Sequence, residues 1–182
     1  MPATISLHGP EPGAAQSAPS PLPTDPRERL RPRMAGTPIH PQTLLATDYL
    51  NHFNEPAMLL EILADSPEAL EDLTAWKPLS YTDHFRASGL SYAEIAVEAY
   101  AAALPQHRVA FELVVAEMNA LVVAAAHKAA DAVRTGDAAA FATLATEAHR
   151  LQELVAEAGG IIQGEPSTRH DQAAIDALMG KR

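Results

Sequence analysis

The residues Phe111–Arg134, FELVVAEMNALVVAAAHKAADAVR, form the longest periodic stretch of the sequence. Because an α-helix makes one turn in about 3.6 residues, apolar residues at alternating spacings of four and three line up as a single stripe. This stretch carries such a heptad stripe at Phe111, Val115, Met118, Val122, Ala125, Ala129 and Ala132. The pattern predicts a long helix from about residue 106 to residue 134.

A second helix with the same period follows directly. Gly136 is placed to end the first helix, and Asp137 is placed to cap the second. Two matching stripes joined by a tight turn predict an antiparallel helical hairpin whose arms approach closely where the stripes are rich in alanine. The second stripe consists of Phe141, Leu144, Ala148, Leu151, Val155 and Ala158. Leucines on the outer faces also need cover, which we expect from the N-terminal helices; a homodimer is the alternative.

The segment Thr47–Leu63, TDYLNHFNEPAMLLEIL, predicts the first helix of the bundle. Its apolar residues recur at helical spacing, with Thr47 or Asp48 as the cap. Pro56 has no N–H and crowds the carbonyl of His52, so we expect a kink, or two helices meeting there, that frees this carbonyl. Polar side chains gather beside the expected kink, and we single them out as a cluster of unknown role: Asp48, Asn51, His52, Asn54 and Glu55.

Three shorter helices are expected between this helix and the hairpin. Ser66-Pro67 predicts a capped start of a helix that reaches about Trp76. Ser80 is expected to cap a short helix over 81–87. Ser91 and Glu94 form a capping box that opens a helix to about residue 104.

These elements predict an all-α fold, a helical bundle built on the long hairpin. The predicted bundle covers residues 43–158, and the proline-rich residues 1–42 are expected to be a disordered tail. Gly159-Gly160 is expected to end the last long helix and to begin a linker over 159–170. Residues 171–182 follow as a short amphipathic peptide. Within the tail, Arg27, Arg29, Arg31 and Arg33 are expected to be solvated, and Met34 offers an alternative start of the chain.

Composition excludes several classes of partner. Thirteen Lys and Arg residues against 23 Asp and Glu residues give a net charge of −10, which disfavours nucleic acid and anionic membranes. The sequence has no cysteine, as is common in a reducing cytoplasm, and its start lacks the features of a secretion signal. No apolar run approaches the roughly 18 residues of a membrane-spanning helix. We therefore expect a cytoplasmic protein.

No motif assigns a catalytic residue, a cofactor or a metal ligand. Helical bundles that hold two metal ions use Glu-x-x-His repeats, and none occurs here. His52 and Glu55 have this spacing in the reverse order, so a metal-binding bundle around them stays an alternative. The sequence also lacks the Gly-x-Ser-x-Gly elbow of hydrolases and the glycine-rich loops that bind nucleotide phosphates.

The peptide DQAAIDALM, residues 171–179, has a recognisable pattern. It resembles the short helix, (S/D)-Q-x-x-(I/V)-D-x-L-(L/M/F), by which CheZ-type chemotaxis phosphatases and flagellar motor switch proteins bind CheY-type response regulators. The matching residues are Asp171, Gln172, Ile175, Asp176, Leu178 and Met179. The order of a long helical hairpin, a linker and this terminal peptide is also similar to the CheZ-type proteins. The resemblance implies a response-regulator receiver domain as partner.

The hairpin departs from the CheZ-type pattern in its catalytic pair. That family carries Asp-x-x-x-Gln, whose glutamine orients water, whereas Gln152 is preceded at that spacing by Ala148. Another phosphatase pattern, Glu-x-x-Asn, is only approached by Asp48 and Asn51. We therefore expect a non-enzymatic adaptor of bacterial signalling or motility. A response-regulator phosphatase using Asn51, Asn54 or Gln152 is the alternative.

Overall fold

The computed structural model describes residues 25–166, and over this range the fold is all-α, as the sequence predicted. The one β contact in these residues is an isolated bridge between Ile39 and Ala46. In chain order the elements are α1 (Pro26–Met34), the 3-10 turn η1 (Thr47–Leu50), α2 (Asn51–Ile62), α3 (Ala69–Ala75), α4 (Tyr81–Ala87), α5 (Ala93–Ala102), α6 (Pro105–Thr135) and α7 (Ala138–Ile162).

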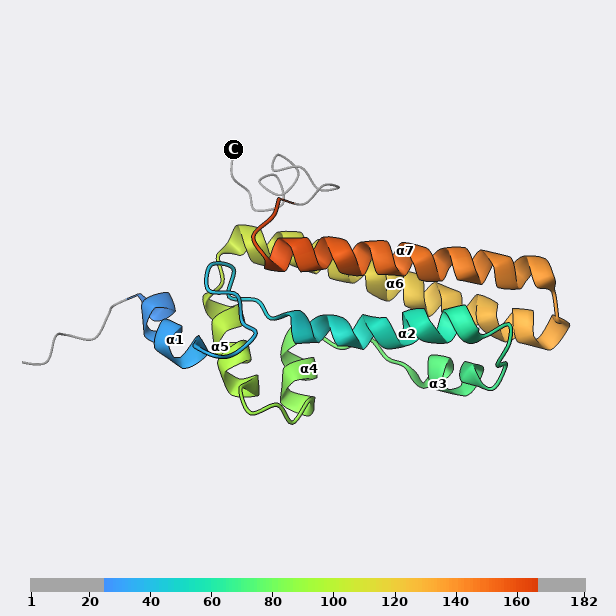
Figure 1. Cartoon of the computed structure of the whole chain (residues 1–182), viewed down its shortest axis with the longest axis horizontal. Helices are drawn as coiled ribbons and strands as arrows, with labels where there is room; N and C mark the ends of the chain where they lie inside the picture. Colours follow the sequence, from blue (N-terminus) through green and yellow to red (C-terminus); the bar gives the residue numbers. More distant parts are fainter. Residues whose placement is uncertain (1–24, 167–182) are drawn as a thin grey trace, which may run out of the picture.

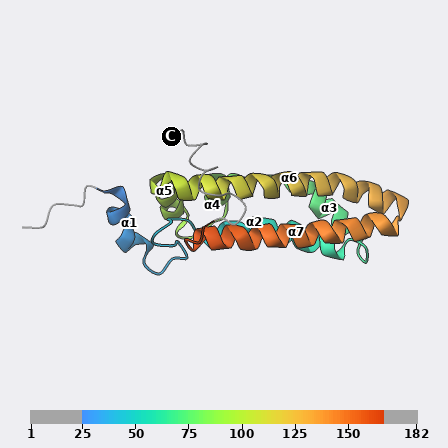
Figure 2. The ribbon, with the colours of Figure 1, turned by 90° about the horizontal axis from the view of Figure 1, so that it is seen from above.

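The two long helices, α6 and α7, run antiparallel side by side, and α1 lies beyond one end of the pair (Figures 1 and 2). Gly136 joins them with a φ of 67°, in the left-handed region, and its N–H donates to the carbonyl of Ala132. The Asp137 side chain then accepts the N–H of Ala139 at 2.9 Å, so the two predicted cap residues hold the turn. The α2 helix packs along the pair, chiefly on α7.

Most residues of the two predicted stripes are buried. Met118 and Val122 on α6 and Leu151 on α7 are 0% exposed. Val115 and Val155, however, are only half-buried, and their neighbours Val114 and Leu154 are fully buried instead. The helix α2 explains this difference, because it packs on both α6 and α7. Each long helix therefore buries residues that face α2 as well as residues that face the other long helix.

Two groups of side chains fill the interior. The larger lies around η1, α4, α5 and the start of α6, and its largest members are aromatic: Tyr49, Phe53, Phe85 and Phe111. The smaller lies near the Gly136 turn, where leucines of α2 and α3 pack on alanines of α6 and on Leu144 and Ala148 of α7. Small side chains on the hairpin therefore leave room for larger ones on its neighbours.

Residues 25–42 belong to the folded body, so the prediction of a disordered tail over 1–42 is wrong for this part. Helix α1 packs on α5 and buries Leu30 and Met34, and Ile39 is also buried. Arg33 forms an ion pair with Glu98 of α5, and Asp25 caps α1 by accepting the N–H of Arg27 at 2.9 Å. The prolines and arginines concealed this helix, because two apolar residues four apart are a weak pattern. Residues 1–24 lie outside the described residues.

Helix α7 continues through Gly159-Gly160 to Ile162, so the predicted linker boundary at residue 159 is also wrong. Ile161 and Ile162 are buried, and the hydroxyl of Thr43 donates to the carbonyl of Ile162 at 2.6 Å. Packing of this last turn against the loop before η1 outweighs the low helix propensity of glycine. A Cβ on Gly159 would meet Leu50 in ordinary contact, at 3.8 Å.

Of the four N-terminal caps predicted for α2, α3, α4 and α5, only that of α4 is confirmed. The Ser80 hydroxyl accepts the N–H of Asp83 at 3.1 Å, and α4 spans the predicted residues. Helix α2 begins without a side-chain cap, since η1 precedes it. Helices α3 and α5 begin two or three residues after Ser66 and Ser91 and have no side-chain cap. In both of these the chain enters the helix through backbone turns.

By length and composition, α6 could cross a membrane, with a mean hydropathy of 1.9 over its most apolar 18 residues. This contradicts the expectation that no segment reaches that criterion, because scattered polar residues interrupt the run without lowering its mean hydropathy enough. Core helices of soluble proteins meet the same criterion, and in the structure α6 packs against α7, α2 and α3.

Candidate functional site

The polar cluster predicted beside Pro56 divides into an inner and an outer part. Asp48 lies on η1 and His52 in the first turn of α2, and both are half-buried toward the aromatic core. Asn51, Asn54 and Glu55 lie on the exposed face of α2. The five residues therefore do not form one site, and the inner pair gains its partners from other helices.

Pro56 lies within α2 and is buried. The carbonyl of His52, which a residue with an N–H at position 56 would bond, instead accepts the indole Nε1–H of Trp76 at 3.0 Å. The His52 ring stacks on the same indole, with ring centroids 4.8 Å apart and an angle of 23° between the planes. Trp76, directly after α3, thus satisfies the backbone group that proline leaves free.

A second imidazole faces the first. The rings of His52 and His84 have centroids 5.9 Å apart, and the Tyr49 ring contacts both. Burial lowers the pKa of both histidines, and for His52 the neighbouring His84 lowers it further. The Nε2 atom of His52 is buried and has no hydrogen-bond partner within residues 25–166. Both sites therefore favour the neutral imidazole more than water does.

Asp48 connects η1 to α5. Its carboxylate accepts a hydrogen bond from the hydroxyl of Tyr92, the residue before α5. Burial and this carboxylate both raise the pKa of Tyr92, so the phenol stays protonated and keeps donating. Asp48 is thus committed to a structural contact rather than left open to act as a base.

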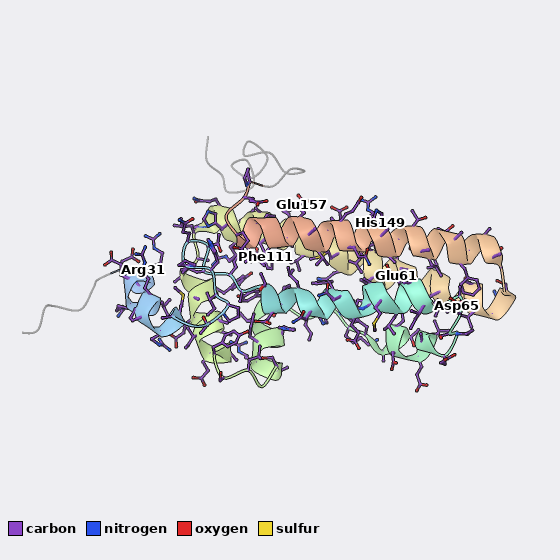
Figure 3. All side chains as sticks on the ribbon, in the orientation of Figure 1. Arg31, Glu61, Asp65, Phe111, His149 and Glu157 are labelled. Atoms are coloured by element: carbon purple, nitrogen blue, oxygen red, sulfur yellow. The ribbon has the colours of Figure 1, made fainter. Side chains whose placement is uncertain are left out.

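The outer part of the cluster carries amides that bond locally. The Asn54 side chain donates to that of Asn51 at 3.3 Å on the exposed face of α2. Gln152 of α7 donates to Glu61 of α2 at 2.6 Å; Glu61 is labelled in Figure 3 on the side of α2 that faces α7. Gln152 therefore lies far along the chain from the other two amides and joins two helices.

Within the described part of the chain, His52 and Glu55 gain no third residue that could complete a metal site. Among residues 25–166 no three His, Cys, Asp or Glu side chains converge as a metal site would require. Glu55 is exposed, whereas His52 turns its ring onto Trp76. The six residues of the proposed partner-binding peptide, Asp171, Gln172, Ile175, Asp176, Leu178 and Met179, lie outside the described residues.

Reasoning from sequence missed the partners of the inner pair and a pocket beside it. Trp76, His84 and Tyr92 come from three different short segments. The pocket lies between the turn before α4, helix α5 and the first half of α6. The available signal was the series of aromatic residues 76, 81, 85, 92 and 100 in a chain with few aromatics.

Comparison with known proteins found no matching family model, no matching curated protein and no matching solved structure. The function is therefore inferred from the residues of this chain and from the pattern of its C-terminal peptide.

Proposed function

We propose that this protein is a non-enzymatic, cytoplasmic helical adaptor of bacterial chemotaxis, motility or two-component signalling. Residues 171–179 would bind the receiver domain of a response regulator. The observation that carries the proposal is the pattern DQAAIDALM, in which Ile175, Leu178 and Met179 recur at the spacing of one apolar helix face. An amphipathic helix in a groove is a common mode of protein recognition.

The polar groups of the body support an adaptor over an enzyme. Gln152 is the hairpin residue that resembles the catalytic glutamine of CheZ-type phosphatases. Its side chain donates a hydrogen bond to Glu61, and the residue four positions before it is Ala148 rather than an aspartate. Asn51 and Asn54 bond to each other. His52 and His84 pack on aromatic rings, and Asp48 accepts from Tyr92. No nucleophile with an adjacent base emerges among these residues.

The test is binding of the full-length chain to a CheY-type receiver domain held in its phosphorylated state, measured by fluorescence anisotropy of the labelled receiver. Ile175→Asp with Leu178→Asp should abolish binding, because two carboxylates would enter the apolar face of the peptide. The matched control is Ala173→Asp with Ala177→Asp, which adds the same charge at positions that the pattern leaves open.

Equal binding by the two double variants would contradict the proposal. Phosphate release from the receiver is measured in the same samples. Release accelerated by the protein and lost in Gln152→Ala would favour the phosphatase alternative instead.

A further inference from the structure

A pocket of about 390 Å3 lies at the base of α6, on the surface between α5 and the turn before α4. Its floor is aromatic: Tyr49, Tyr81 and Phe111 are at most 3% exposed, and the half-buried Tyr100 forms one wall. Glu112 and Asn119 of α6 supply polar groups to the lining. A mostly apolar hollow of this size with a few polar groups is typical of a small-ligand site.

The aromatic floor is held rigidly by contacts that a ligand would not need to break. Tyr81 and Tyr100 stack with centroids 4.5 Å apart and an angle of 15°. The Tyr49 hydroxyl donates to the carbonyl of Leu79 at 2.7 Å, and that of Tyr81 accepts the N–H of Ala46 at 2.8 Å. The site is therefore formed before any ligand arrives, which limits the entropy lost on binding.

The charged groups of the pocket favour a cation. Glu112 has 52% of its side-chain surface exposed and accepts a hydrogen bond from the hydroxyl of Tyr100. Burial, followed by this carboxylate, raises the pKa of Tyr100, so the wall carries a neutral phenol. The net charge of −10 adds an attractive field for cations.

The chain itself already places a cation on this wall. The guanidinium carbon of Arg108 lies 5.9 Å from the centroid of the Tyr100 ring, and Arg108 Nε lies 3.8 Å from Glu112 Oε1. A positive group over a tyrosine face and beside a carboxylate combines cation–π attraction with an ion pair. Arg108 thus shows that this wall can hold a cation, although Arg108 itself does not line the pocket.

Asn119 adds a polar atom that the fold leaves unsatisfied. Its side chain lines the pocket, and its Oδ1 atom is buried with no hydrogen-bond partner among the described residues. A buried acceptor without a donor is unfavourable, and a donor group on the body of a bound ligand would remove this cost.

We propose that this pocket binds a small organic cation, a primary ammonium group on an aromatic or aliphatic body. The body packs on Tyr81, Tyr100 and Phe111, and the ammonium group pairs with Glu112. This binding is independent of the adaptor function proposed above, since it uses only residues of the body.

The test is an NMR titration of the 15N-labelled full-length protein with benzylammonium, and with benzyl alcohol as its neutral analogue. Benzylammonium should shift the amide signals of residues 79–81 and 112–119 with a Kd of about 1 mM. Benzyl alcohol should bind at least about threefold more weakly, because it lacks the charge.

Two variants should change the affinity in opposite directions. Glu112→Gln should weaken benzylammonium binding about threefold or more, whereas Arg108→Gln should strengthen it by removing the competing cation. The matched controls alter the net charge equally at exposed positions outside the pocket: Glu68→Gln for the first and Arg86→Gln for the second. Each control should leave the affinity unchanged.

Three results would overturn the proposal. The first is the absence of pocket shifts at 10-fold the expected Kd, about 10 mM. The second is equal binding of the alcohol and the ammonium. The third is a weaker affinity in Arg108→Gln, which would make Arg108 part of the binding surface rather than a competitor.

Discussion

Thr43 is the one buried polar residue among residues 25–166, with an exposed fraction of 0%. Its hydroxyl donates to the carbonyl of Ile162 and lies 3.3 Å from His40 Nδ1. The carbonyl of Ile162 belongs to the last turn of α7, where no later N–H within the helix can reach it. The Thr43 side chain therefore acts as a C-terminal cap supplied from the other end of the domain.

Thr43→Val should lower the free energy of unfolding by about 1–3 kcal/mol, because it keeps the volume and leaves the Ile162 carbonyl buried without a donor. Urea denaturation followed by circular dichroism measures this loss. Thr143→Val is the control: its hydroxyl bonds the carbonyl of Ala139 on an exposed face of α7, where water can replace it. A loss below about 0.5 kcal/mol in Thr43→Val would show that the cap contributes nothing.

At the scale of the element, α6 and α7 depend on side chains buried between them. Leu151→Ala should cost about 2–5 kcal/mol, since Leu151 is 0% exposed and its neighbours can collapse only partly into the cavity. Val123→Ala on α6 should cost far less, because Val123 is 41% exposed. Equal losses in the two variants, measured by denaturation, would contradict the observed register of the hairpin.

The elements that sequence predicted well are those whose signals are local. Ser80, Gly136 and Asp137 act through their own backbone neighbours, so their roles could be read from the sequence. Val114 and Leu154 could not be assigned to the core in this way, because their burial depends on where α2 packs. Helix α1 could not be predicted for the same reason, because Leu30 and Met34 are buried by packing against α5.

At the scale of the molecule, neutral histidines couple the fold to pH. Burial lowers the pKa of His52, His84 and His107, and nearby imidazoles lower it further for His52 and His107. Each contributes stability that is fully present above the unfolded-state pKa of about 6.5 and is lost as pH falls through the folded-state pKa. The midpoint of urea denaturation should therefore be lower at about pH 5.5 than at about pH 7.5.

His52→Gln should reduce this pH dependence, because glutamine cannot take up the proton. His127→Gln should leave it intact, since His127 is exposed on α6. An identical difference between the two pH values in the wild type and in His52→Gln would exclude His52 as a contributor.

In the candidate site, too, the sequence predicted features within one helix but not contacts between helices. The sequence identified His52 and the carbonyl that Pro56 frees, because both follow from one helix. It did not identify Trp76, His84 or Tyr92 as their partners, or Tyr100 and Glu112 as walls of one pocket. Those contacts join short helices whose relative placement no periodicity encodes.

The bond between Thr43 and Ile162 has a kinetic consequence. It closes a loop of 119 residues, whereas α6 and α7 meet across a turn of only a few residues. Closing a long loop loses more chain entropy than closing a short one, so we expect the hairpin to form early in folding and this closure to form late. Loosening the bond would then hasten unfolding and leave the rate of folding almost unchanged. We therefore expect the rate of unfolding to depend on the contact between Thr43 and Ile162, and the rate of folding to depend on the hairpin around Gly136.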